Sequence, residues 1–361
     1  MKKLQFIRTL GTALLATAAT TLCTQAVAND TFIFAWPSAI NSGVAPLSYA
    51  KKLGYWQEEN IDLTVQVLTG SGLIVPQLLA GNIHGAYSSL EPLVVARQPG
   101  KPNHPILFPY NYLRNSIWEF AVLKDSPIQS FADMAGTTIG VLALTSGNIF
   151  FLSRAILRSQ GIAENNVKFL GVGTGAASFD ALKTGQIQVL NLFDTAHVRI
   201  EQNGIPIRRI PVPEAFQGLS SHGISVTQKL FQENPDLIAR FGRALSKGTV
   251  ACQANPDSCI RAYWEDYPAM RPRPEQAQDS LQRERDVLKV RMANLNYFRP
   301  GQAHQYGAFS DKDWTILISA LKTGGEISTN EIDLNTLYSN ALVPQYNQFD
   351  VEAVKQQAIA N

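Results

Sequence analysis

Residues 61–88 read IDLTVQVLTGSGLIVPQLLAGNIHGAYS, and this stretch decides the fold class. Its first part, Ile61–Leu68, is rich in β-branched and apolar residues and predicts a strand. Leu73–Ala80 has the composition of a short helix, which ends at Gly81. Ile83–Ser88 then predicts a second strand. A strand, a helix and a strand joined by short turns indicate a parallel β-α-β unit, and therefore a sheet covered by helices.

The same alternation extends in both directions from this unit. Upstream, Thr31–Trp36 predicts a strand and Val44–Tyr55 a helix; downstream, Pro92–Gln98 predicts a helix and Pro105–Tyr110 a strand. After an extended aromatic segment, Tyr112–Val122, a second alternating set begins. It comprises predicted strands Thr138–Leu142, Val167–Gly171, Ile187–Phe193 and Ile207–Val212, and predicted helices Ile149–Gln160, Ala176–Lys183 and Thr195–Asn203. The sequence therefore predicts two α/β lobes in tandem.

The last third of the chain is predicted to be mainly helical. Ser221–Val226 predicts a strand that returns to the first lobe, Glu275–Tyr297 and Asp311–Lys322 predict helices, and Pro344–Asp350 predicts a loop. Together these elements predict a two-lobed α/β protein of the type II periplasmic binding protein class. It would have two doubly wound, mostly parallel sheets, two hinge crossings and a helical C-terminal third.

The N-terminus predicts export. Lys2, Lys3 and Arg8 precede an apolar stretch, and Ala26-Val27-Ala28 has the small-x-small pattern of a signal-peptidase site, so we expect residues 1–28 to be removed after Ala28. The stretch is too short and too rich in Thr and Ala to favour a membrane anchor. Leu22, where a lipoprotein signal would have a small residue, argues against lipid attachment at Cys23. We therefore expect a periplasmic protein.

The mature chain predicted by this cleavage has nearly balanced charge and a length typical of two lobes. Removal of the signal lowers Lys+Arg from 31 to 28 against 29 Asp+Glu, so the sequence pI of about 8.3 owes much to the discarded segment. Without a basic patch, no nucleic-acid partner is expected. The predicted boundaries are 29–116 for the first part of lobe 1, 117–219 for lobe 2, and 220–361 for the second part of lobe 1 with the C-terminal region.

Two cysteines remain after cleavage, Cys252 and Cys259. An oxidising compartment and an even count favour a disulfide between them. They flank Asn255-Pro256-Asp257, a helix-start pattern with a capping Asn and Pro at the first helical position. The bridge would join the end of one helix to the start of the next.

Several short motifs, in order, carry a resemblance to a known family. The chain resembles solute-binding proteins for nitrate, taurine, alkanesulfonates, aromatic acids and thiamine-pyrimidine precursors, over roughly Phe32–Val250. The motifs are Ala45-Pro46-Leu47-Ser48-Tyr49-Ala50 with Gly54-Tyr55, Gly70-Ser71-Gly72, Gln77-Leu78-Leu79-Ala80-Gly81, Asp125-Ser126-Pro127-Ile128, Asp133-Met134-Ala135-Gly136-Thr137-Thr138-Ile139-Gly140-Val141 and Ala181-Leu182-Lys183-Thr184-Gly185-Gln186-Ile187. The resemblance implies capture of a small-molecule ligand without chemistry. We expect the protein to deliver that ligand to an inner-membrane ABC permease and to be a monomer.

Two positions depart from the family pattern. His84 and Gln188 stand where the family usually has an Asp, after the glycine turns at Gly81 and Gly185. We expect both positions to be structural.

Candidate ligand-binding residues lie where the predicted strands end, because ligands of open α/β sheets bind beyond the carboxyl ends of the strands. Ser, Thr and Gly at helix N-termini suit an anion, and we expect the loop Thr145-Ser146-Gly147-Asn148 to cradle a carboxylate or sulfonate. Arg114 is the candidate cation, and aromatic side chains are expected to form apolar walls. The full candidate set is Trp36, Ser38, Asn41, Ser71, Ser88, Arg114, Trp118, Thr145, Ser146, Gly147, Asn148, Thr174, Asp194 and His222. For each loop, ordinary helix capping is the alternative.

No catalytic residue, metal site or cofactor is expected. The five histidines lack metal-ligand spacing, and Gly218-Leu219-Ser220-Ser221-His222-Gly223 is not a nucleophile elbow. We expect an ABC-importer binding protein for a small organic, anionic nutrient whose identity the sequence does not give. Two alternatives remain: an enzyme similar to those that build a thiamine pyrimidine, and a periplasmic ligand-sensing module.

Overall fold

Two five-stranded sheets organise the protein. The computed structural model describes residues 29–101, 104–144 and 147–361. In the first sheet the strand order is β2-β1-β3-β10-β4. Its strands are β1 (Asp30–Trp36), β2 (Ile61–Val67), β3 (Gly85–Ser89), β4 (Ile106–Leu113) and β10 (His222–Thr227). Strand β10 runs antiparallel to both of its neighbours, and the other four strands run in one direction.

The second sheet repeats this plan with the order β7-β6-β8-β5-β9. Its strands are β5 (Trp118–Leu123), β6 (Thr138–Val141), β7 (Lys168–Gly171), β8 (Val189–Phe193) and β9 (Ile207–Ile210). Here β5 is the antiparallel strand. The predicted fold class, two mostly parallel α/β sheets, is confirmed.

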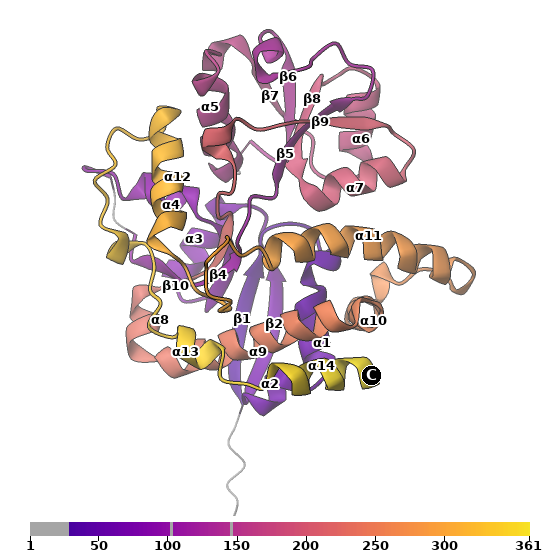
Figure 1. Cartoon of the computed structure of the whole chain (residues 1–361), viewed down its shortest axis with the longest axis vertical. Helices are drawn as coiled ribbons and strands as arrows, with labels where there is room; N and C mark the ends of the chain where they lie inside the picture. Colours follow the sequence, from indigo (N-terminus) through magenta and orange to yellow (C-terminus); the bar gives the residue numbers. More distant parts are fainter. Residues whose placement is uncertain (1–28, 102–103, 145–146) are drawn as a thin grey trace, which may run out of the picture.

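Each sheet takes its antiparallel strand from a crossing between the lobes. The chain leaves the first sheet after Leu113, enters the second at Trp118, leaves it after Ile210 and returns at His222. Figure 1 shows the resulting lobes one above the other, with strands β1–β4 and β10 below and β5–β9 above. The ends of the strands at these crossings therefore lie where the two lobes meet.

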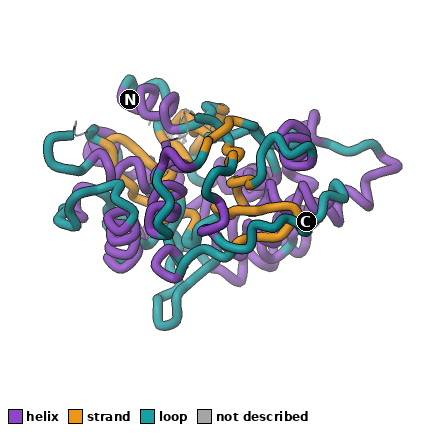
Figure 2. The backbone as a smooth tube through the Cα atoms, turned by 90° about the horizontal axis from the view of Figure 1, so that it is seen from above, coloured by secondary structure: helices purple, strands orange, loops and turns teal. Residues whose placement is uncertain are grey.

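Helices cover both sheets, and in the view from above they surround the strands (Figure 2). They are α1 (Ala45–Lys52), α2 (Tyr55–Glu58), α3 (Ser71–Leu79), α4 (Glu91–Ala96), α5 (Gly147–Ser159), α6 (Ala176–Lys183), α7 (Asp194–Gln202), α8 (Gln228–Glu233), α9 (Pro235–Ala254), α10 (Pro256–Asp266), α11 (Ala277–Leu295), α12 (Asp311–Thr323), α13 (Val343–Tyr346) and α14 (Val351–Ala360).

Two predicted elements differ from the structure. The helix predicted over Val44–Tyr55 is divided into α1 and α2, because Gly54 adopts φ +82°, a left-handed conformation that ends the first helix. The loop predicted over Pro344–Asp350 is wrong in its first half, where α13 forms. Pro344 occupies the first turn of that helix, a position that requires no N–H donor.

The C-terminal third packs against both lobes. Helix α9 packs against α1 of the first lobe, whereas α11 packs against α7 and α12 against α5 of the second lobe. In Figure 1, α11 runs beneath α7, and α12 stands beside α4 and α5. The turn after α12 carries Glu326, whose carboxylate accepts hydrogen bonds from Arg154 and Arg158 of α5. Noncovalent contacts thus connect the lobes in addition to the two crossings.

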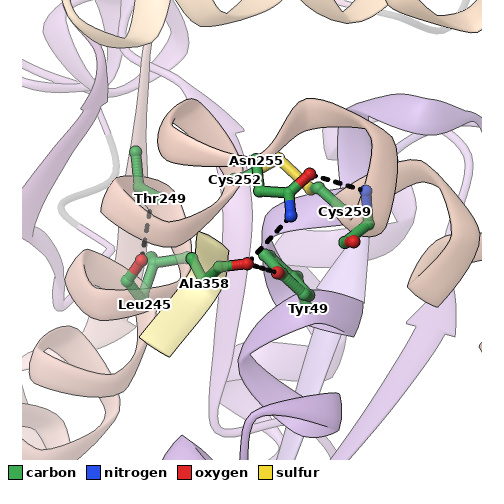
Figure 3. Close-up of a disulfide and its surroundings, with 8 residues drawn as sticks. Tyr49, Leu245, Thr249, Cys252, Asn255, Cys259 and Ala358 are labelled. Carbon is green, nitrogen blue, oxygen red and sulfur yellow. Dashed lines mark hydrogen bonds between the residues drawn. A yellow bond between two sulfur atoms is a disulfide. The ribbon is translucent and has the colours of Figure 1, made fainter. Parts of the chain in front are cut away.

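The predicted disulfide between Cys252 and Cys259 is present and joins the end of α9 to the start of α10. The side chain of Asn255, between the two cysteines, accepts a hydrogen bond from the backbone N–H of Ser258 and caps α10. The same side chain donates to the carbonyl oxygen of Ala358, which also accepts from the hydroxyl of Tyr49 (Figure 3). The bridge therefore lies where α1, α10 and the C-terminal helix α14 meet.

His84 and Gln188 have the same structural role in the two lobes. His84 Nδ1 accepts a hydrogen bond of 2.9 Å from the backbone N–H of Ile33 in β1, and Gln188 Oε1 accepts one of 2.9 Å from Thr138 in β6. In each case the backbone N–H of the same residue donates to the carbonyl of that strand residue. The interpretation of both positions as structural is confirmed by these bonds.

Candidate functional site

A cleft between the two lobes brings together six of the candidate residues. It encloses about 520 Å³, including its mouth. The first lobe contributes the ends of β1 and β3. The second lobe contributes the start of β5 and the end of β8, and α11 adds one side chain. The candidates on its walls are Trp36, Ser38, Asn41, Ser88, Trp118 and His222, and they are joined by Pro37, Gly70, Tyr87, Ser89, Ile117, Leu142, Phe193 and Arg291.

The walls of the cleft are mainly aromatic. Trp36 stacks on Tyr87 with ring centroids 4.6 Å apart, and Tyr87 stacks on His222 at 4.5 Å. From the second lobe, Trp118 lies 6.0 Å from His222 and meets Phe193 edge-on, also at 6.0 Å. These rings are flat and closely packed, so the cleft suits a flat apolar body.

His222 is fixed between two serines. Its Nε2 lies 2.8 Å from the hydroxyl of Ser89, and its Nδ1 lies 2.7 Å from the hydroxyl of Ser221. Complete burial, with a smaller contribution from the positive charge of Arg291, holds the pKa of the imidazole well below its usual range. The ring is therefore neutral at physiological pH, and both of its nitrogens are occupied.

Arg291 supplies the charge of the cleft. It comes from α11 and is 4% exposed. Its Nη2 donates to Asp194 Oδ1 at 2.7 Å and to Thr195 Oγ1 at 3.2 Å. The other oxygen of Asp194 accepts a hydrogen bond of 2.8 Å from Asn294. Asp194, a predicted ligand contact, thus holds the cleft arginine in place.

Buried donors without partners also surround the cleft. Within the described part of the chain, the indole N–H groups of Trp36 and Trp118, the hydroxyl of Tyr87 and Nε of Arg291 have no hydrogen-bond partner. A buried polar group without a partner costs about 1–3 kcal/mol, so such groups mark a place where a partner is expected to bind. Four of them border one cleft, which points to a ligand.

A second cavity of about 900 Å³ adjoins the cleft. The two share Asn41 and Phe193, and the second is bounded by α6, α7 and α11. Thr174, another candidate residue, lies on this second wall together with Thr195 and Arg199. Arg199 is already paired with Glu284 of α11. Thr174 is therefore close to the cleft but not part of its aromatic wall.

Arg114 lies outside the lining of the cleft. Its Nε donates to the carbonyl of Tyr297 at 3.0 Å and its Nη1 to the carbonyl of Ala308 at 2.8 Å, and its guanidinium lies over the ring of Phe298. These contacts attach the first crossing to the segment after α11. The cation of the cleft is Arg291 instead.

The remaining candidates belong to two helix starts. Thr145 and Ser146 lie outside the described residues, while Gly147 and Asn148 form the first turn of α5, and Ser71 begins α3. The anion cradle predicted at residues 145–148 therefore stays a prediction.

Sequence reasoning missed two central residues, Tyr87 and Arg291. Tyr87 could have been found, because it lies in the predicted strand whose end supplied Ser88. Arg291 gave no signal, because it is one of three arginines in the amphipathic sequence of α11. Among the described residues, no group of three or more His, Cys, Asp or Glu could hold a metal ion. No helix in the described ranges is long and apolar enough to cross a membrane.

Comparison with protein families places the chain. The sequence model of the family described as "NMT1/THI5 like" matches residues 41–259. The protein belongs to the NMT1/THI5-like family. The match includes most of both sheets and both crossings, and it ends before α11. Arg291 is thus supplied by a part of the chain outside the stretch that matches the family.

The chain is similar to a curated relative in sequence and to solved structures in fold. The riboflavin-binding protein RibY of Chloroflexus aurantiacus is 25% identical over 311 residues, which cover 84% of this NMT1/THI5-like chain and 83% of RibY. The alkanesulfonate-binding protein SsuA of Xanthomonas axonopodis pv. citri, solved with bound MOPS, is 13% identical with a TM-score of 0.60, covering 87% of this chain and 100% of SsuA. The desulfurization enzyme DSZB has the same fold, at 14% identity and a TM-score of 0.54, covering 88% of this chain and 99% of DSZB. The fold therefore occurs in binding proteins and in an enzyme.

Proposed function

We propose that this protein is the periplasmic substrate-binding component of an ABC importer, which captures a small organic nutrient and delivers it to an inner-membrane permease. The observation that carries the proposal is the aromatic cleft between two lobes joined by two crossings. Trp36 and Tyr87 contribute from the first lobe, and Trp118 and Phe193 from the second. A ligand that contacts both sets is held only when the lobes are together.

Capture would work as a shift between conformations. A ligand that binds the closed form better than the open form stabilises the closed form by its difference in affinity. The permease would then recognise the closed lobes. We further propose that the protein acts as a monomer and that residues 1–28 direct it to the periplasm.

Two relatives support a binding role. RibY is a riboflavin-binding protein and SsuA an alkanesulfonate-binding protein, so proteins similar to this one hold ligands of different chemistry. Riboflavin and alkanesulfonates are therefore the first ligands to test.

We propose that the cleft performs no chemistry. The arrangement Ser89–His222–Ser221 is the nearest approach to a nucleophile with a base. Burial lowers the pKa of His222 well below its usual range, which makes the imidazole a weak base near neutral pH. The aromatic stack on one face of the ring also fixes it in the wall. The imidazole of His222 thus has a structural role in the wall of the cleft.

A thermal-shift screen of the mature chain tests the proposal. Riboflavin, alkanesulfonates, aromatic carboxylates, nitrate and thiamine-pyrimidine precursors are compared, because a ligand that binds only the folded protein raises its melting temperature. For any compound that raises it, Trp118→Phe should weaken binding about tenfold, since the variant loses an indole N–H donor worth roughly 1.4 kcal/mol.

Trp264→Phe is the matched control. Trp264 is also a buried tryptophan with an unpaired N–H, but it lies in α10 and does not line the cleft. Equal loss of binding in both variants would contradict the assignment of the cleft. Turnover of any compound that binds would contradict a binding role without chemistry.

A further inference from the structure

The cleft offers hydrogen-bond donors to its ligand. Its free polar groups are the indole N–H groups of Trp36 and Trp118, the hydroxyl of Tyr87 and Nε–H of Arg291, all on side chains at least nine-tenths buried. Three of the four can only donate. Two of the side chains, Trp36 and Arg291, lie on either side of Gly43, because a Cβ atom there would lie 3.4 Å from the Trp36 ring and 3.5 Å from Arg291 Nη1.

Several acceptors in and beside the cleft are already used. Both nitrogens of His222 are bonded to serine hydroxyls, and the hydroxyl of Ser88 is bonded to Ser225. Oδ1 of Asn41 accepts from the backbone N–H of Gly43. Both carboxylate oxygens of Asp194 are also bonded. A ligand therefore gains most by presenting acceptors.

The charges at the cleft cancel. Of the described residues that line it, Arg291 alone carries a charge, and Asp194 neutralises that charge through a hydrogen bond of 2.7 Å. Both side chains are 5% exposed, so solvent screens neither of them. An anionic ligand would add an unbalanced charge to a buried neutral site, which costs several kcal/mol before its hydrogen bonds are counted.

We propose that the ligand of this cleft is a flat, uncharged ring compound whose edge carries hydrogen-bond acceptors. The inference rests on the proposed function and refines it, replacing the carboxylate or sulfonate expected from the sequence. The aromatic side chains that line the cleft, Trp36, Trp118 and Phe193 among them, favour a flat ring. The four donors select the acceptors, and the Arg291–Asp194 pair selects zero net charge. Asp194 is thus a specificity-determining residue that acts through Arg291.

Matched pairs of compounds test this proposal by calorimetry on the mature protein. The pairs are nicotinamide with nicotinate, uracil with orotate, and riboflavin with riboflavin 5′-phosphate. Each pair keeps its ring and differs by an anionic group. We expect the neutral member of the pair that binds to have a Kd at least tenfold lower than its anionic partner.

The variant Asp194→Asn should move this ratio. Removal of the carboxylate leaves the charge of Arg291 unbalanced, so the preference should shift at least tenfold toward the anionic member. Asp180→Asn is the control, because Asp180 is an exposed carboxylate on α6 of the same lobe and should leave the ratio unchanged. If Asp194→Asn does not fold, the ratio for the wild-type protein decides alone.

The outcomes separate this proposal from the function on which it rests. Tighter binding of the anionic members by the wild-type protein would overturn the uncharged ligand and leave the transport role intact. Binding of an alkanesulfonate, with none of the six ring compounds bound, would overturn the ring class while supporting capture. No shift of the ratio in a folded Asp194→Asn protein would overturn the role of the ion pair.

Discussion

Replacement of Glu326 by Gln tests how firmly the C-terminal third is attached to the second lobe. The side chain of Glu326 is 3% exposed, and its carboxylate accepts three hydrogen bonds of 2.7–3.0 Å from Arg154 and Arg158. Breaking a buried ion pair costs about 3–5 kcal/mol when the partner charge stays buried. Here the arginine side chains are 23% and 34% exposed and can be hydrated. We therefore expect Glu326→Gln to lower the free energy of unfolding by about 2–3 kcal/mol.

Urea denaturation followed by circular dichroism measures this loss. The transition midpoint should fall while the slope with urea stays the same, because the surface exposed on unfolding does not change. Glu164→Gln is the control: Glu164 pairs with the same two arginines, but its side chain is 49% exposed, so its removal should cost under about 1 kcal/mol. Equal costs for the two variants would refute the reasoning, because burial would then not determine the strength of the contact.

Three further perturbations have expected outcomes. Reduction of the Cys252–Cys259 bridge, or its replacement by two serines, should lower the free energy of unfolding by about 2.4 kcal/mol through the entropy of the closed loop. The loss is measured as a lower urea midpoint. An unchanged midpoint would contradict a stabilising role for loop closure. Burial lowers the pKa of His84, so its contribution to stability is complete above about pH 6.5 and is lost as the pH falls below that value. The loss should be less than about 1 kcal/mol per pH unit. The melting temperature of His84→Gln should therefore change less between pH 7 and pH 5 than that of the wild-type protein. A Cβ atom on Gly248 would lie 2.4 Å from a backbone oxygen of α1, so Gly248→Ala should destabilise the protein by about 1–3 kcal/mol, and an unchanged urea midpoint would show that α1 and α9 can separate freely.

The strands and their order along the chain were predictable because each β-α-β unit is local. The period of the apolar residues and the glycine turns determine each unit, and parallel strands must be joined by crossovers. The same reasoning placed Trp36, Ser38, Asn41 and Ser88 near one another, because the carboxyl ends of neighbouring strands meet at one edge of the sheet. The positions of these residues could be predicted without knowing how distant parts of the chain pack together.

The cation of the cleft was not predictable, because it depends on such packing. Arg114 was favoured by its place beside the first crossing, but its guanidinium lies against backbone carbonyls of residues 297 and 308. Arg291 comes from a helix whose position depends on contacts with α7, which lies far away in the sequence. Sequence periodicity gives the apolar face of such a helix, but not the site that one of its polar residues enters.

The contacts of α11 with α7 and of α12 with α5 have a consequence for the rate and cost of ligand capture. These two contacts lie at separate places and add to the two crossings, so they restrict the directions in which the second lobe can move relative to the first. Fewer accessible orientations in the free protein mean less configurational entropy to lose on closure. A small ligand with few contacts can then be retained. Once it is bound, the lobes close by a short rotation and do not search over many relative orientations.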